Sequence, residues 1–541
     1  MNKCDTLILG KILTLDTDVS IVEAIACKDG VIVYAGDKQV ARQLCCDNAI
    51  ILDYSNNYIY PGFFDSHTHG SVAGQRLKFQ CDLKEGNSMK DYVAILKKYI
   101  EQNPGRKNYQ GSGWSNKGEF NASMLDELNV DVPIILSSVD GHSIWVNSVC
   151  LKECGIDAIK AKELGTDIVH VDDNGNPTGW LSESIAMSIM SNYAPTKQDI
   201  KEGLLAWQDF AFASGMTAVV DASGDAFADS LDAYKELVDE GKWKLRTYAY
   251  NIYKKYLFTP DEYVKKIKKD ISIYNSEYFK IIGGKMFIDG VVEAHTAFLI
   301  DSYADQKDYY GVFNCKGNEE SFKKLVKKLN AEKIPMHFHT IGDAAAKYAL
   351  DCIEYSEINN NDFTIKNCLA HLEIIKPEDI ERLAKLCAIA IVAPLWVPVT
   401  DYLNQQEIKY IGEDRVRKAY PIKSFENAGA TICFHTDYPV TSIVGYPNTF
   451  YDACKRKDKI KGDKSIRNTD EGIDQIRSLL AITVNGAYMV NEQNRLGRLI
   501  PGMIANCVVY DNDLLDKNIE NVPNCQLLAT IIDGRIVYEK K

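Results

Sequence analysis

The chain has 541 residues, which predicts about two to four structural units, and 46% of its residues are hydrophobic, enough for a sizeable core. The formal net charge of −13 argues against binding to nucleic acids or to anionic membrane surfaces. No stretch approaches the roughly 18 uncharged apolar residues of a membrane span, and the first residues lack the pattern of a signal peptide.

The two ends of the chain share one pattern. Residues 24–34 and 528–538 each consist of two apolar segments joined by Asp-Gly, which is a strong β-hairpin signal. Further strands are predicted at 6–15 and 506–510. We therefore expect the two ends to form one small β domain together.

Between the two ends, short apolar segments alternate with longer helical patterns. Strands that alternate with helices indicate βαβ units and a parallel sheet, and eight units predict an α/β fold of the (β/α)8 TIM-barrel type. Because about 150 residues with strand and helix signals of their own follow the first strand, we expect an inserted α/β subdomain at about 80–200. The predicted strands are 59–65, 216–221, 245–250, 279–288, 334–339, 367–371, 388–393 and 430–436, and the predicted helices include 199–214, 319–332, 376–386 and 421–427.

Several of the nine histidines follow predicted barrel strands. In barrel enzymes, catalytic groups collect at this rim. Residues two apart in a strand point to the same face, so a His-x-His pair is able to bind one ion, and imidazole and carboxylate suit zinc and similar divalent metals. The ordered set is His67 and His69 after the first strand, His339 at the end of the fifth, His371 at the end of the sixth, and Asp437 at the end of the eighth, where His435 also lies.

Each member of this set also has an ordinary structural explanation. A single histidine at a strand end is commonly a core or rim residue, and His337, which shares a strand face with His339, is equally well explained by packing inside the barrel. The ordered occurrence over four strands is much less expected by chance. We therefore interpret the set as a metal site.

These residues lie in motifs that resemble a known family. Residues 61–69, PGFFDSHTH, resemble the opening motif of the amidohydrolase superfamily. Later motifs resemble its amidohydrolase-3 branch, which includes N-substituted formamide deformylase-like enzymes, and they occur in the right order over nearly the whole chain. They are VDGHSIWVNS (139–148), PTGWLSE (177–183), GKMFIDG (284–290), HTIGDA (339–344), HLEIIKPED (371–379), TDYPV (436–440) and LGRLIPGMIAN (496–506).

The resemblance implies a fold and a metal centre. A metal-bearing barrel is expected at 59–494, beside a β-sandwich built from 1–58 and 495–541. The resemblance implies two divalent metal ions as cofactors. Zinc is the first expectation, although the same ligands also suit Mn, Fe or Ni. By resemblance, one ion is bound by His67 and His69 with Asp437 beside it, and the other by His339 and His371.

Lys285, at the end of the fourth strand, matches the lysine that binuclear members carboxylate to bridge two metals. Unlike an ammonium, a carbamate formed with CO2 is an anionic ligand with two oxygens, and burial favours the neutral amine that this reaction requires. The alternative is a salt-bridged structural lysine beside a single metal.

The implied reaction is hydrolysis of a C–N bond in an amide-like small molecule, such as an N-substituted formamide or an acylated amine. Metals lower the pKa of a shared water, and Asp437 takes the proton and delivers it to the departing amine. Asp289 and Asp343 are candidates for orienting the histidines. A homodimer is expected by analogy alone.

Further residues are candidates for contacts with the substrate. His435 stands where relatives carry a small residue, and His295 where an arginine is common. Three more residues are candidates for lining the pocket, and each also has a structural explanation, as a histidine in a tight turn or as a tryptophan of the core. These three residues are His142, Trp114 and Trp145.

Two other functions stay open. With one metal, the chain would be a deaminase of an aminated heterocycle. A non-catalytic binding protein with the same fold is less expected, because all six candidate metal ligands are present. The fifteen cysteines are odd in number and irregularly spaced, so we expect reduced, mostly buried thiols and a cytoplasmic location.

Overall fold

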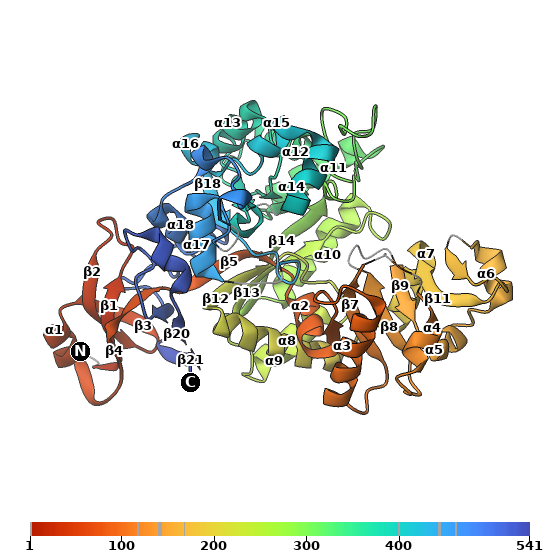
Figure 1. Ribbon diagram of the computed structural model, residues 1–541. Helices are drawn as coiled ribbons and strands as arrows, with labels where there is room; N and C mark the ends of the chain where they lie inside the picture. The colour runs from red at the N-terminus through yellow and green to blue at the C-terminus, as the bar shows by residue number, and fades with distance from the viewer. Residues whose placement is uncertain are drawn as a thin grey trace. The chain divides into compact units, whose positions relative to one another are not determined.

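The computed structural model describes residues 3–115, 118, 120–138, 143–166, 168–398, 401–441, 445–459 and 462–541. The chain forms two compact units, whose elements are drawn in Figure 1. The first unit comprises Met1–Gly70, Gln208–Ala226 and Tyr234–Lys541. The second comprises Ser71–Trp207 and Phe227–Ala233. No helix in the described ranges combines the length and the apolar character needed to cross a membrane.

The first unit contains an eight-stranded parallel sheet that curves into a nearly closed barrel. Every neighbouring pair of strands runs in parallel. The predicted barrel fold is therefore confirmed. The strands, in sheet order, are β5 (Phe63–Thr68), β12 (Met216–Asp221), β13 (Arg246–Ile252), β14 (Phe279–Phe287), β15 (Met336–Thr340), β16 (Cys368–His371), β17 (Ile389–Val392) and β18 (Thr431–Phe434).

The barrel strands are buried along nearly their whole length, as expected for a parallel sheet covered on both faces. Phe64, Tyr250, Cys368 and Ile391 belong to one buried cluster, to which six of the barrel strands contribute buried residues. This apolar layer holds the strands together. The polar residues of the site lie beyond it, towards the C-terminal ends of the strands. Helices that follow these strands include α9 (Ser230–Asp239), α10 (Pro260–Ile273), α11 (Glu319–Ala331), α12 (Asp343–Asn360), α13 (Pro377–Lys385), α16 (Ile422–Asn427) and α17 (Tyr446–Lys455).

The first barrel strand begins later than predicted. Residues 59–61 are the end of the long strand β4 (Cys45–Pro61), and β5 starts after Gly62. A side chain at Gly62 would lie 2.2 Å from Oγ1 of Thr217, so only glycine allows the chain to pass this closely from one sheet to the next. The apolar run that continues through this change of sheet hid the boundary in the sequence.

Both ends of the chain contribute to one seven-stranded sheet. Its two predicted hairpins are confirmed, and both turn at Asp-Gly with positive φ, at Asp29-Gly30 and Asp533-Gly534. Ile8 and Ile25 from one end share a buried cluster with Val509 from the other. The sheet order is β21 (Arg535–Glu539), β20 (Leu527–Ile532), β19 (Cys507–Tyr510), β4, β1 (Cys4–Leu13), β2 (Ile21–Lys28) and β3 (Val31–Gly36).

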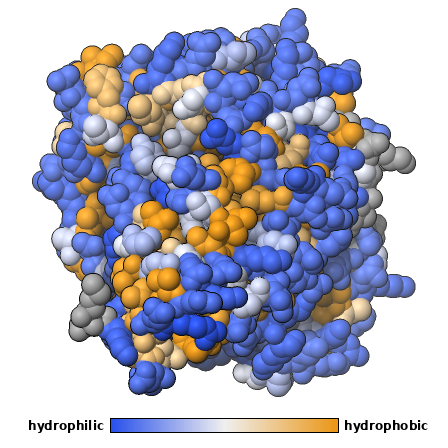
Figure 2. All heavy atoms as spheres, turned by 90° about the vertical axis from the view of Figure 1, so that its left-hand side faces the viewer, coloured by the Kyte–Doolittle hydropathy of each residue, from blue (hydrophilic) through white to orange (hydrophobic). Residues whose placement is uncertain are grey.

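The terminal sheet also carries exposed apolar side chains. Ile21, Val33, Ile50 and Ile51 are each at least half exposed. Figure 2 faces the side of the first unit that holds this sheet and shows patches of hydrophobic surface among hydrophilic residues. Exposed apolar residues are common on folded proteins, so these positions alone identify no partner.

The second unit is a mixed α/β structure around a six-stranded sheet. Strands β6 to β8 run in parallel, and the remaining pairs are antiparallel. Helices α3 (Met89–Gln102) and α7 (Glu183–Asn192) belong to this unit. The sheet order is β10 (Val169–Val171), β11 (Pro177–Ser182), β9 (Ser143–Val146), β8 (Ile134–Ser138), β7 (Tyr109–Trp114) and β6 (Gln80–Asp82).

Candidate metal centre

The first and last barrel strands bring two histidines and one carboxylate together. His67 lies in β5, His69 follows that strand, and Asp437 lies three residues after β18. Oδ1 of Asp437 is 3.2 Å from Nε2 of His67 and 3.0 Å from Nε2 of His69. Within the described part of the chain, this is the one group of three or more His, Cys, Asp or Glu whose ligand atoms lie within 4.8 Å of one another.

The second ring nitrogen of each histidine is held in place. Nδ1 of His67 is 2.8 Å from Nε2 of His337, and Nδ1 of His69 is 2.6 Å from Oγ of Ser223. A partner on one ring nitrogen fixes the orientation of the other. Both Nε2 atoms are therefore directed towards Asp437.

Asp437 itself has the features of a ligand. Its Oδ1 is buried and has no partner with hydrogen-bond geometry, although both Nε2 atoms are close, so the three atoms converge on a shared point. Burial raises the pKa of Asp437, but His67 and His69 outweigh this and hold it well below its usual range. Asp437 also has a positive φ of 55°, and such strain in a residue other than glycine, of about 1–3 kcal/mol, is typical of functional sites.

His339 and His371 form a second part of the same cluster. Nδ1 of His339 is 3.1 Å from Oδ1 of Asp289, a carboxylate that also accepts hydrogen bonds from three backbone N–H groups. The ring of His371 lies 4.6 Å from that of His339 and 4.9 Å from that of His67, between ring centres. Nδ1 of His371 is buried without a hydrogen-bond partner, and its φ is 81°.

Of the two carboxylates expected to orient histidines, Asp289 alone contacts one among the residues that the structure describes. Asp343 instead accepts hydrogen bonds from the N–H groups of Ile300 and Ala344, and it lies 3.5 Å from Nζ of Lys376. Asp343 therefore links the loop around Ile300 to the start of α12.

Lys285 lies in β14, two residues before the end of this strand, inside the barrel. Its side chain is fully buried, and Nζ has no hydrogen-bond partner in the described structure. Burial lowers the pKa of Lys285 to about 7. An amine with this pKa is largely uncharged just above neutral pH, which is the form that reacts with CO2.

His435 completes the cluster of imidazoles. Both of its ring nitrogens are buried without a hydrogen-bond partner, and its ring centre is 5.2 Å from that of His67 and 5.1 Å from that of His371. Burial lowers the pKa of His435 to about 4, so the ring is neutral. Trp396 stacks on His371 at 5.3 Å and meets His435 edge-on at 5.5 Å. The sequence offered no motif for Trp396, only its place shortly after the seventh strand.

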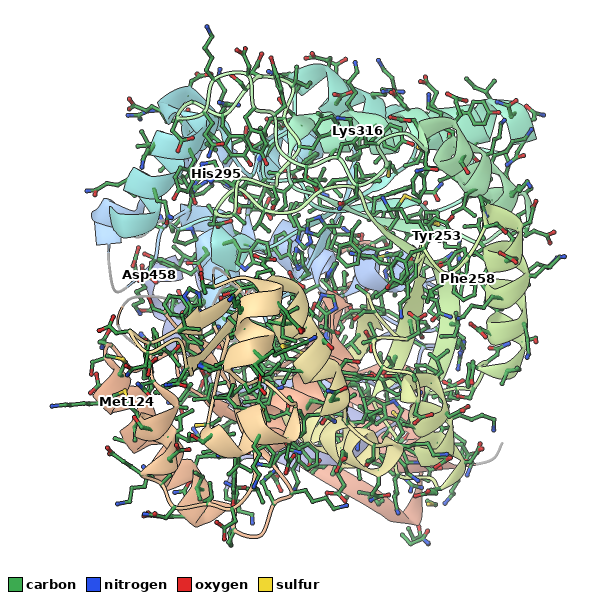
Figure 3. All side chains as sticks on the ribbon, turned by 90° about the vertical axis from the view of Figure 1, so that its right-hand side faces the viewer. Met124, Tyr253, Phe258, His295, Lys316 and Asp458 are labelled. Atoms are coloured by element: carbon green, nitrogen blue, oxygen red, sulfur yellow. The ribbon has the colours of Figure 1, made fainter. Side chains whose placement is uncertain are left out.

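The other candidates for substrate contacts lie elsewhere or outside the described residues. His295, which is labelled in Figure 3, lies in the segment between β14 and α11. Its Nε2 is 3.1 Å from both carboxylate oxygens of Asp305, and its ring packs on Tyr410. Trp114 and Trp145 are fully buried in the core of the second unit, and this burial supports the core alternative. His142 falls outside the described residues.

A separate cavity of about 350 Å³ lies between the segment after β13 and the start of α11. Tyr253, Phe258 and Phe322 are among its lining residues, and none of the predicted site residues is (Figure 3). This cavity is therefore not the centre formed by the histidines.

The donor set fits divalent metal ions. Imidazole nitrogens and a carboxylate are typical zinc ligands; here Oδ1 of Asp437 is buried without a hydrogen-bond partner, and neighbours orient the imidazoles of His67 and His69. Leaving such polar groups unpaired costs about 1–3 kcal/mol each, and ions remove this cost. The arrangement is thus suited to holding ions at the C-terminal rim of the barrel.

Comparisons with known proteins agree with this fold. Residues 51–538 match the model of the Amidohydrolase family. The chain is 26% identical to Protein LONG AFTER FAR-RED 3 of Arabidopsis thaliana, covering 98% of this chain and 90% of that protein. It is 24% identical to N-substituted formamide deformylase of Arthrobacter pascens, covering 99% and 98%. A metal-dependent hydrolase from Pyrococcus horikoshii OT3 has the same fold, with a TM-score of 0.77, 22% identity and coverage of 95% and 99%.

The chain belongs to the amidohydrolase family, since the family model matches most of its length. It is accordingly a metal-dependent hydrolase that acts on carbon–nitrogen bonds of small molecules.

Proposed function

We propose that the histidine cluster holds two divalent ions, zinc in the first instance, and hydrolyses an N-substituted formamide or another acylated amine. The observation that carries the proposal is the convergence of Nε2 of His67, Nε2 of His69 and Oδ1 of Asp437 within 4.8 Å. The similarity to N-substituted formamide deformylase over almost the whole chain supports the substrate class.

Six residues would hold the two ions. His67 and His69, with Asp437 beside them, would hold the first ion, and His339 and His371 would hold the second. Lys285, once carboxylated at Nζ, would be the sixth ligand, and its complete burial without a hydrogen-bond partner supports this assignment. When bound, two such ions would polarise a carbonyl group and lower the pKa of a shared water from about 15.7 towards 7.

Residues of the chain transfer the proton and orient the imidazoles. Asp437 accepts it at a carboxylate oxygen as the water attacks the carbonyl carbon, and then donates it to the departing nitrogen, so that an amine and a carboxylic acid leave. His337, Ser223 and Asp289 keep the imidazoles in their tautomers and orientations.

His435 and Trp396 line the space beside the cluster and contact the substrate. A neutral imidazole offers one N–H donor and one acceptor, and both nitrogens of His435 are unused by the described protein. We also propose His142 and His295 as substrate contacts.

We further propose a cytoplasmic location, because all fifteen cysteines, each of them described, are unpaired.

The proposal is tested by metal analysis of the purified protein together with a substrate panel of formamides, acylated amines and cyclic amides. Release of amine and acid is the expected result. Release of ammonia from an aminated heterocycle, with one ion per chain, would instead assign the chain to deamination. Tight metal binding without any hydrolysis would favour a binding protein.

A further inference from the structure

The metal centre is built across the seam of the barrel. The sheet runs from β5 to β18, and these two edge strands carry the histidine pair and the segment leading to Asp437. Across this edge, the N–H of Asp437 donates to the carbonyl of His67 at 3.0 Å, and the N–H of His69 donates to the carbonyl of Tyr438 at 2.9 Å. The described structure shows no β-ladder between β5 and β18, so few bonds fix the distance between the two sets of ligands.

Asp65 supplies further bonds across this seam. Its side chain is fully buried in β5, two residues before His67. Oδ1 accepts hydrogen bonds from the N–H groups of His67 and Thr436, each at 3.2 Å. Oδ2 accepts from Oγ1 of Thr436 at 2.7 Å and from the hydroxyl of Tyr446 at 3.1 Å. One carboxylate thus joins a proposed ligand on one strand to the neighbour of another ligand across the seam.

This arrangement matches the chemistry of a carboxylate. An ionised Asp has room for about four hydrogen-bond donors, and four are present, from the two sides of the seam and from α17. Burying a carboxylate is costly unless these hydrogen bonds are made. Since the donors come from both sides of the seam, the bonds form only when the two edge strands lie close together.

We propose that Asp65 is a positioning residue that sets the separation between the β5 imidazoles and Asp437, and thereby the affinity for the first ion. The inference rests on the proposed function, because it assumes that this trio binds an ion. Asp65 acts through the backbone of His67 and Thr436, and it has no contact with the reacting atoms.

Two variants separate positioning from charge. Asp65→Ala removes all four bonds, and the affinity for Zn²⁺ should fall roughly 10–100-fold, as for other groups that orient ligands. Asp65→Asn keeps one oxygen for the two N–H groups, and the hydroxyls of Thr436 and Tyr446 are able to rotate and accept from its NH2. Its affinity should therefore stay within about threefold of wild type, which a role of the negative charge would not allow.

A matched control accounts for loss of stability. Asp270 is also a buried carboxylate with two hydrogen bonds, from Asn251 and Lys266, and it lies on α10. Asp270→Ala should lower the thermal unfolding midpoint without changing Zn²⁺ affinity or the absorption spectrum of the Co²⁺-loaded protein. Asp65→Ala should change both.

The experiment is competition for Zn²⁺ against a chromophoric chelator, with Co²⁺ spectra of the same variants. Unchanged affinity and spectrum in Asp65→Ala would overturn the inference, and so would an equal loss of affinity in Asp65→Asn and Asp65→Ala. A wild-type protein that binds neither Zn²⁺ nor Co²⁺ would instead contradict the proposed function itself.

Discussion

Asp437→Asn should abolish most turnover while leaving the metal centre largely assembled. Asp437 has a φ of 55°, a left-handed conformation that asparagine tolerates about as well as aspartate, whereas alanine would add about 1–2 kcal/mol of strain. The amide has the same shape and keeps one oxygen near the two Nε2 atoms. The substitution therefore removes the charge and the proton acceptor with little other change.

The size of the effect follows from the role. A positioned general base contributes about 10²–10⁴-fold to the rate, so kcat of Asp437→Asn should fall by that factor. Turnover is measured by amine release with the best substrate of the panel, and metal content by elemental analysis of the same samples. Asp343→Asn is the control, because Asp343 is a buried carboxylate near the rim that contacts backbone N–H groups and Lys376. If Asp437→Asn keeps turnover within about fivefold of wild type, Asp437 is not the proton carrier.

Three further changes test the surrounding residues. Asp289→Asn places an NH2 group among three backbone N–H donors and should lower the affinity for one ion roughly 10–100-fold in chelator competition, and equal loss of both ions would contradict its link to His339. His435→Phe keeps a ring but removes both nitrogens, so kcat/KM should fall about tenfold at unchanged metal content, with partial recovery in His435→Gln; loss of metal would make His435 a ligand instead. Burial lowers the pKa of Lys285 to about 7, so the amine is protonated below and neutral above this value, and reactivation of metal-free protein by Zn²⁺ and bicarbonate should be roughly tenfold faster at pH 8 than at pH 6. A rate independent of pH over this interval would contradict carboxylation of the neutral amine.

Much of the fold was predictable because it depends on local patterns. The barrel strands show as short apolar runs separated by helical patterns, and the Asp-Gly turns at 29–30 and 533–534 require the positive φ that those residues permit. The start of β5 was not predictable in the same way. The apolar run crosses from one sheet to another, and the reason is a close contact between Gly62 and Thr217, which lie more than 150 residues apart.

The candidate site, too, was predictable only in part. Positions at strand ends predicted that the histidines and Asp437 meet, since the C-terminal ends of parallel strands meet at one rim. The partners that orient them come from tertiary packing, which spacing does not encode. His337 beside His67, Ser223 beside His69 and Asp65 across the seam each depend on contacts between strands. Trp396 is a similar case, because its ring is placed by His371 and His435 and not by a motif.

Lys285 is the residue that, in our proposal, allows the centre to hold two ions. The direct measurement is the number of metal ions per chain in wild type and in Lys285→Ala, both purified with zinc and bicarbonate and compared at equal folded content. Two ions in wild type and at most one in the variant are predicted, with bicarbonate-dependent loading in wild type only. Two ions retained in Lys285→Ala, or a single ion in fully loaded wild type, would contradict the account.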